Sequence, residues 1–296
     1  MTAFLLTSAS VGTWMDKTFL GFDLGVFAFF GKMGCGFLNV LARIFTALGE
    51  SKYVIMLAVL GLILILFKKT RKYGMALVFS IIIGTLITNV IVKPVFLRIR
   101  PYNTLQYLPE YFGWYTNAGM LAESDYCFPS GHTTAAFEIA ISMFLCFCAD
   151  GKKKFAWVLP VLAVLSGLSR IYLMVHYATD VVAGTIVGIF AGVVGYFISK
   201  QITNRCSGRT GWNRFDLGRV IGEKTGKPIS RRTACSLIAA VWAVIFAVSL
   251  VFTFKAGGES LRCAYDGEYQ CYNEIKEKDE YLIRSEEHTS ELQSLA

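Results

Sequence analysis

The sequence predicts an all-α fold, a polytopic transmembrane helix bundle of about six spans with amphipathic helices at its N-terminal end. Its 296 residues are 54% hydrophobic and 17% charged, with a mean hydropathy of +0.51. Soluble domains rarely have such a balance. Long apolar runs recur along the chain, and basic residues gather between them. These observations together indicate an integral membrane protein.

Six apolar runs approach the roughly 20 helical residues that cross a bilayer. They cover residues 53–67, 74–92, 133–149, 155–169, 181–199 and 234–254. The stretch from Trp14 to Leu48 is different, because charged residues interrupt it at helical spacing. We interpret this stretch as interfacial amphipathic helices, with a seventh span as the alternative. No basic segment precedes an apolar core at the N-terminus, so we expect no cleaved signal peptide.

The net charge of +8 comes mainly from three connections between the apolar runs, at residues 68–72, 152–154 and 200–232. The positive-inside rule predicts that these connections face the cytoplasm. Residues 97–131 and 174–179 and the tail after 255 then face outward. Because topology explains the basic residues, we do not expect nucleic-acid binding.

Polar residues beside the spans form three groups, although such groups are expensive near a membrane. The first is "KPVFLRIRP", with Lys93 and Arg100 two helical turns apart. The second is "FPSGHT", where a tight turn begins a helix and backbone N–H groups can face an anion. The third is "SRIYLMVHYATD", which joins two spans. Topology predicts that all three groups lie at the outer face.

Together these groups have the chemistry of a phosphoryl site. Lys93, Arg100 and Arg170 form a cationic cluster. His176 and Asp180 are four residues apart, so on a helix the carboxylate orients the imidazole. His132 lies in another group, where it can supply or withdraw a proton.

Each residue also has a simpler interpretation. Lys93 can be an interfacial anchor, and Arg98, Arg100 and Arg170 can bind lipid headgroups. Thr179 or Asp180 can cap a helix, and Ser130 and Ser169 can end helices. These interpretations do not explain why topology brings three separate groups to one face.

The three groups resemble the pattern of the membrane-bound type 2 phosphatidic acid phosphatases (PAP2), which is shared with vanadium haloperoxidases. That pattern is Lys, six residues, Arg-Pro; then Pro-Ser-Gly-His; then Ser-Arg, five residues, His, three residues, Asp. The chain matches every position, and the match spans about residues 50–200. The implied fold is a helix bundle of the PAP2/haloperoxidase-like type.

The resemblance implies a mechanism without metal or other cofactor. His176 is the nucleophile of a phosphohistidine intermediate, and Asp180 orients it. His132 is the general acid and then the general base. Lys93, Arg100 and Arg170 stabilise the phosphoryl oxygens with Ser130 and the Gly131 N–H. We expect no magnesium site, because Glu110, Glu123 and Asp125 are scattered in the sequence.

The expected protein is a multi-pass cell-membrane phosphatase whose active site faces the extracytoplasmic side. An aromatic-rich segment, residues 102–128, is expected to form a belt or lid at headgroup level. The substrate is then a lipid phosphate. The resemblance leaves undecaprenyl pyrophosphate, phosphatidic acid and phosphatidylglycerophosphate open. The outward site and the bacterial character of the chain favour the first.

Two rival functions use the same residues differently. A transporter needs charges near span centres and broken helices in paired repeats, whereas the charges here lie at span ends. A non-catalytic lipid-binding scaffold has no need for both His132 and His176. Nothing in the sequence indicates a protein partner.

We divide the chain into six segments. They are an interfacial segment (1–50), the PAP2 phosphatase core (51–200), a basic cytoplasmic loop (201–232), the last transmembrane helix (233–255), an outer tail (256–283) and residues 284–296. The last segment contains "RSEEHTSELQS", which resembles a translated sequencing adapter, so we interpret it as an artefact. A disulfide between Cys263 and Cys271 in the outer tail stays open.

Overall fold

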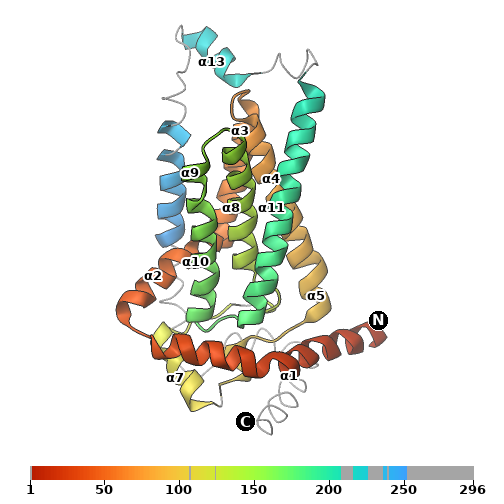
Figure 1. Ribbon diagram of the computed structural model, residues 1–296, viewed down its shortest axis with the longest axis vertical. Coiled ribbons are helices and arrows are strands. Elements are labelled where there is room, and N and C mark those ends of the chain that lie inside the picture. Colours follow the sequence, from red (N-terminus) through yellow and green to blue (C-terminus); the bar gives the residue numbers. More distant parts are fainter. Residues whose placement is uncertain are drawn as a thin grey trace.

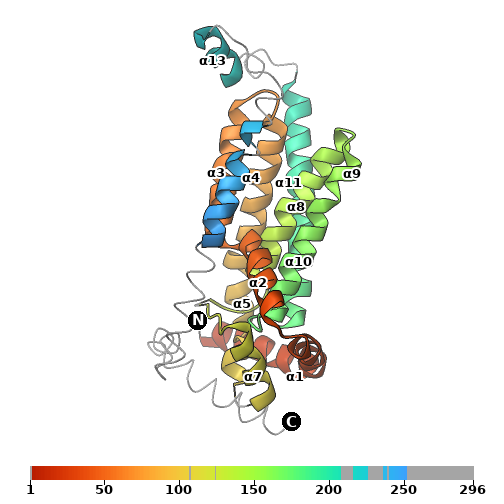
Figure 2. The same cartoon turned by 90° about the vertical axis from the view of Figure 1, so that its left-hand side faces the viewer.

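The computed structural model describes residues 2–106, 108–123, 125–207, 216–225, 236–238 and 240–251. Five helices run side by side in an elongated bundle (Figures 1 and 2). They are α3 (Ser51–Leu66), α4 (Arg71–Thr85), α8 (Gly131–Ala149), α10 (Val158–Tyr172) and α11 (Ala178–Cys206). Helix α11 packs mainly against α8 and α4, and α10 packs against α8. The predicted all-α fold is therefore confirmed for these residues.

Shorter helices connect and flank the bundle. They are α2 (Gly36–Thr46), η1 (Ala47–Gly49), the π-helix η2 (Leu86–Val92), α5 (Lys93–Phe96), α6 (Pro101–Thr104), α7 (Pro109–Ala118), α9 (Lys153–Ala156) and α13 (Leu217–Thr225). A further apolar helix covers Ser236–Val251. The Cys263–Cys271 pairing, the artefact segment and much of the basic loop lie outside the described residues.

Four helical segments in the described part of the chain are long and apolar enough to cross a membrane. They are Arg71–Thr104, Gly131–Ala149, Lys153–Tyr172 and Ala178–Cys206. Gly36–Gly49 and Ser51–Leu66, bent by 43° at their junction, make five if they count as one span. A multi-pass membrane protein is therefore confirmed, but the predicted count of about six spans is not.

Helix α1 (Thr2–Lys32) lies across one end of the bundle, nearly perpendicular to the long helices (Figure 1). Two of its carboxylates face the protein, because Asp16 and Asp23 are 2% and 0% exposed. Trp14 and Phe29 are largely exposed. The crosswise orientation is the one expected of an interfacial helix. Its contact with a membrane surface stays a prediction.

The two ends of the bundle differ in chemistry. At one end, Lys72 and Tyr73 bond to Asp150, and the Ser199 hydroxyl donates to the Lys72 carbonyl at 2.7 Å. These contacts bring together two of the connections that the charge pattern assigns to the cytoplasm. The polar segments around residues 93–100, 128–133 and 170–180 lie at the other end, with α1 and α7 (Figure 1).

The aromatic-rich segment differs in part from the expected belt. Tyr102, Tyr111 and Tyr115 are at most 6% exposed and lie in one apolar cluster with Phe27 of α1. The Tyr111 hydroxyl donates to the Met174 carbonyl at 2.6 Å. Buried tyrosines need such a partner for the hydroxyl group. These tyrosines therefore fix α7 against the turn after α10, rather than lying among lipid headgroups.

Glycines allow α11 to approach α8 closely. Gly184, Gly188 and Gly192 recur every four residues, so they share one face of α11. A Cβ atom at Gly188 would lie 2.6 Å from the Thr134 carbonyl oxygen, and one at Gly184 would lie 2.7 Å from the Ser130 carbonyl oxygen. Small residues at this spacing are typical of tightly packed membrane helices.

This packing makes Gly188→Ala destabilising, because the new methyl group would push α11 away from the backbone of α8. We expect a loss of about 1–3 kcal/mol in the free energy of unfolding, measured by denaturation in detergent. Gly25→Ala in α1 is the control, since a Cβ atom there meets nothing within 4 Å. Equal stability of the two variants would contradict close α8–α11 packing.

Candidate active site

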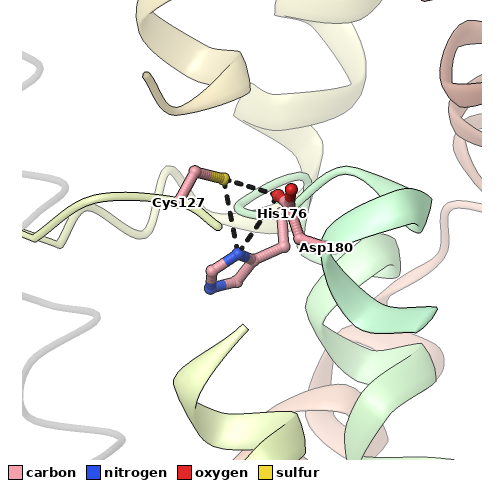
Figure 3. A group of neighbouring side chains, drawn as sticks. All are labelled: Cys127, His176 and Asp180. Carbon is pink, nitrogen blue, oxygen red and sulfur yellow. Dashed lines mark hydrogen bonds and ion pairs between the residues drawn. The ribbon is translucent and has the colours of Figure 1, made fainter. Parts of the chain in front are cut away.

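The predicted His176–Asp180 pair is present and buried. His176 lies in the turn between α10 and α11, and Asp180 is in the first turn of α11. His176 Nδ1 is 3.5 Å from Asp180 Oδ2, and the two residues are 1% and 0% exposed (Figure 3). The opposite ring nitrogen, Nε2, is 3.0 Å from Arg100 Nη1. The ring therefore lies between a carboxylate and a guanidinium group.

Asp180 also has the helix-capping role that the sequence left as an alternative. Its Oδ2 accepts the Tyr177 backbone N–H at 2.9 Å, and its backbone carbonyl accepts the Ser130 N–H at 3.1 Å. The carboxylate thus fixes the start of α11 while it faces the imidazole. The capping bonds leave little freedom in the position of Asp180.

Cys127 completes this group of side chains (Figure 3). Its Sγ is 2.7 Å from Asp180 Oδ2 and 3.4 Å from His176 Nδ1. Burial and the neighbouring Asp180 carboxylate raise the pKa of the Cys127 thiol well above its usual range. The thiol therefore stays protonated and donates to the carboxylate.

Arg98 anchors the far side of Asp180. Its Nη1 donates to Asp180 Oδ1 at 2.6 Å and to the Thr179 hydroxyl at 2.7 Å. Its Nε donates to Asp16 at 2.6 Å, and its Nη2 donates to Asp23 at 3.0 Å. Arg98 is 1% exposed. One buried guanidinium group thus joins two carboxylates of α1 to the carboxylate beside His176.

From the sequence, Arg98 was expected only to bind lipid headgroups, and no role in the site was predicted for Asp16, Asp23 or Cys127. Asp16 and Asp23 are seven residues apart, a spacing that places both on one face of a helix. That spacing within an apolar stretch was the available signal for a buried partner. Their partner is distant in the chain, so no local pattern identifies it.

The predicted cationic cluster (Lys93, Arg100 and Arg170) forms at this end of the bundle. Its three side chains are 6%, 3% and 1% exposed. Arg100 Nη1 donates to the Val175 carbonyl at 3.1 Å, and Arg170 Nη1 donates to the Thr46 hydroxyl at 2.7 Å. Arg170 Nε is buried without a hydrogen-bond partner among the described residues. The cluster thus presents several N–H donors at one place.

Two carboxylates from the loop between α7 and α8 occupy the cationic cluster. Glu123 bonds to Arg170 and lies 2.7 Å from Arg100 Nη2, and Asp125 bonds to Lys93 and Arg100. Burial opposes ionisation of both groups, but the surrounding cations hold the pKa of Glu123 well below its usual range and that of Asp125 at about 2. Although these acids are scattered in the sequence, folding brings Glu123 and Asp125 onto the cations.

His132, Ser130 and Gly131 border the same site at the start of α8. Ser130 is the N-cap residue, and its Oγ accepts the Thr133 hydroxyl at 2.9 Å and the Thr133 N–H at 3.4 Å. His132 Nε2 is 3.3 Å from Glu50 Oε2, and its Nδ1 is 3.8 Å from Glu123 Oε1. Glu50 is a further site residue that the sequence did not indicate. The structure thus brings all eight predicted site residues to one end of the bundle.

The surroundings of His176 favour its neutral form. Burial and the adjacent Arg100 guanidinium outweigh Asp180 and lower the pKa of His176 to about 3. With Arg100 donating to Nε2, the lone pair of that nitrogen points toward the cationic cluster. Near neutral pH the ring is therefore uncharged, and its basic nitrogen accepts from Arg100 at the edge of the cationic cluster.

One group of side chains in the described part of the chain has ligand atoms spaced for a metal ion. Cys127, His176 and Asp180 have potential ligand atoms within 4.8 Å of one another. This set of atoms matches zinc in type. However, Arg98 and Arg100 lie within 3.0 Å of Asp180 and His176, so a cation there would meet two guanidinium groups. The site suits an anion instead.

The chain resembles known proteins in sequence. The model of the PAP2 superfamily matches residues 73–204. The chain is 30% identical over 203 residues to an undecaprenyl-diphosphatase of Sulfolobus acidocaldarius, covering 67% of this chain and 87% of that protein. It is 30% identical over 160 residues to phosphatidylglycerophosphatase B of Bacillus subtilis, covering 51% and 70%.

A solved structure has the same fold. The crystal structure of a transmembrane PAP2-type phosphatidylglycerolphosphate phosphatase from Bacillus subtilis aligns with a TM-score of 0.52. Its sequence identity is 24%, and the alignment covers 68% of this chain and 96% of that chain.

The Arg98 network yields a stability prediction. Arg98→Leu removes the partner of three buried carboxylates, so we expect the free energy of unfolding to fall by about 3–5 kcal/mol. Thermal unfolding of the purified protein measures this change. Arg205→Leu, at an exposed position near the other end of α11, is the control. If both variants unfold at the same temperature, Arg98 does not hold the network.

Proposed function

Because this chain belongs to the PAP2 superfamily of phosphatases, we propose that it hydrolyses a lipid phosphate or pyrophosphate through a phosphohistidine at His176. The orientation of the imidazole is the observation that carries the proposal. His176 Nδ1 faces Asp180, and Nε2 faces the cationic cluster. A nucleophile directed at a bound phosphoryl group needs this arrangement.

Each reaction step then has a residue in place. Nε2 of His176 attacks phosphorus, the bond from phosphorus to the lipid oxygen breaks, and His132 protonates that oxygen. In the second step His132 takes a proton from water, the water oxygen bonds to phosphorus, and the phosphorus–nitrogen bond breaks. Glu50, 3.3 Å from His132 Nε2, orients that ring. Orthophosphate and the lipid product then leave.

The cationic cluster stabilises the charge that develops on the equatorial phosphoryl oxygens. Glu123 and Asp125 support this role, since an anion already occupies the cluster. A phosphoryl group carries more charge and more acceptor oxygens than either carboxylate. Substrate binding therefore displaces Glu123 and Asp125, and the Ser130 hydroxyl and Gly131 N–H become available to it.

Topology supports an extracytoplasmic site. The connection between α3 and α4 and the one between α8 and α9 lie at the end of the bundle opposite the turn between α10 and α11 (Figure 1). If these connections face the cytoplasm, His176 faces outward. A site at that level meets lipids whose phosphate lies at the surface and whose chains stay in the bilayer.

Undecaprenyl pyrophosphate is the first substrate to test. The similarity to an undecaprenyl-diphosphatase, over 87% of that protein, supports this choice. Phosphatidylglycerophosphate and phosphatidic acid are the alternatives, and the likeness to phosphatidylglycerophosphatase B supports the former. The rate of phosphate release by the purified protein, measured with each of the three lipids, ranks them as substrates.

His176→Ala removes the nucleophile, so we expect phosphate release to fall by at least about 10³-fold. When the reaction with ³²P-labelled lipid is stopped in alkaline detergent, we expect the wild-type protein to carry a label that later acid treatment removes, and the variant to carry none. An unchanged unfolding temperature shows that the variant is folded. Activity retained within about tenfold would exclude histidine as the nucleophile.

A site that binds its oxyanion by cations alone responds to vanadate and not to chelators. We expect vanadate to inhibit competitively with the lipid, because it presents the same oxygens to Lys93, Arg100 and Arg170. We expect less than about twofold loss of activity in EDTA. A large loss in EDTA that zinc or magnesium restores would indicate a metal-dependent reaction.

A further inference from the structure

A cavity of about 610 Å³ extends from the cationic cluster into the bundle. Helices α3, α4, η2 and α8 form its walls. Lys93, His132 and Arg170 line its outer end, and Gly84, Thr88 and Glu138 line its inner end. The reaction steps above use only the outer end. The inner end lies well within the length of the spans, where polar side chains cost more free energy than apolar ones.

Glu138 is the unusual residue of this inner end. It lies in the second turn of α8 after His132, and it is 1% exposed. Its Oε2 has no hydrogen-bond partner among the described residues. Buried polar atoms nearly always have a partner, so an unsatisfied carboxyl oxygen that lines a cavity indicates a ligand.

The surrounding residues leave room for this carboxyl group. A Cβ atom at Gly84 would lie 1.5 Å from Glu138 Oε2, so a larger residue there would make the carboxyl group shift. Thr88 Oγ1 donates to Thr134 Oγ1 at 3.3 Å, and the Thr134 hydroxyl lies 3.1 Å from the Ser130 carbonyl and 3.3 Å from the Gly184 carbonyl. The threonines thus satisfy one another and the backbone. Oε2 of Glu138 packs against Gly84 without a hydrogen-bond partner among the described residues, and the Glu138 side chain borders the cavity.

Helix geometry gives the distance between the two ends of the cavity. Ser130 and Glu138 are eight residues apart on α8, which is about 12 Å of axial rise. Side chains lean toward the N-terminus of their helix, so the carboxyl group is about 10 Å from the level of the cationic cluster. If the phosphate of a lipid lies on the cluster, the lipid atom that reaches Glu138 is about eight extended bonds from phosphorus.

We propose that the inner end of the cavity is a second subsite, in which Glu138 binds a hydroxyl group on the acyl chain of a lipid phosphate. In a glycerolipid phosphate, the third carbon of the acyl chain is at about the required distance. A hydroxyl donates a hydrogen bond to a carboxyl oxygen, and its own oxygen accepts one from the carboxyl O–H if the carboxyl is protonated. The subsite therefore recognises lipids with hydroxyacyl chains, which are a substrate class additional to polyprenyl pyrophosphates.

This inference rests on the proposed function, and one set of measurements tests both. The substrates are phosphatidic acid with unsubstituted chains, phosphatidic acid with 3-hydroxyacyl chains of equal length, and undecaprenyl pyrophosphate. The readout is kcat/KM for phosphate release in detergent micelles. We expect the wild-type protein to favour the hydroxyacyl lipid by about tenfold or more over its unsubstituted match, because a site built for a hydroxyl discriminates against its absence.

Two variants assign the preference to Glu138. We expect Glu138→Leu to bring the ratio of kcat/KM values for the two phosphatidic acids to about one, since leucine offers no acceptor. Glu138→Gln keeps an acceptor oxygen and retains part of the preference. Ser166→Ala is the control, because Ser166 Oγ is also buried and unpartnered among the described residues but does not line the cavity.

The possible failures are distinguishable. No phosphate release from any of the three lipids would overturn the proposed function. Hydrolysis of both phosphatidic acids at equal rates by the wild-type protein, or phosphate release from undecaprenyl pyrophosphate alone, would overturn the subsite alone. So would a ratio that Glu138→Leu leaves unchanged, or an equal loss on all three lipids, which would show a purely structural role for Glu138.

Discussion

The buried ion pair between Arg98 and Asp180 is the interaction on which the rest of the site depends. Burying a guanidinium group is costly unless carboxylates surround it. Arg98 therefore draws Asp16 and Asp23 of α1 beneath the bundle, and α1 lies across its end as a result. The same contact holds Asp180 at the start of α11, and Asp180 in turn faces His176. One buried cation thus joins a peripheral helix to the proposed nucleophile.

The second constraint is the balance of charge at the cationic cluster. Three buried cations require counter-ions when no phosphate is bound, and Glu123 and Asp125 supply them from a neighbouring loop. The lowered pKa values of these two acids express the same attraction. The loop residues hold the cations in position, and in the proposed reaction they give way to the phosphoryl group. Preorganisation of this kind lowers the cost of reorganising the site during reaction.

Substrate selection depends on a different part of the molecule. The cationic cluster recognises the phosphoryl group that all candidate lipids share, so it does not separate them. The cavity below it has a polar inner end, where Glu138 lies against Gly84 with one carboxyl oxygen unpaired among the described residues. In the proposed subsite, residues within the spans discriminate between lipids.

Composition and apolar runs determined the helical membrane fold, and motif spacing with the resemblance to the PAP2 pattern predicted the eight proposed site residues. Phosphoryl chemistry needs fixed side chains at fixed helical intervals, and these intervals are visible in the sequence. Only the tertiary structure decided that Glu123 and Asp125 pair with the cations, that Arg98 binds three carboxylates, and that Glu138 faces a cavity. Each of these depends on partners dozens of residues apart. Periodicity reports which residues share a face of one helix, whereas the helix that packs against that face is set by the packing of the whole bundle.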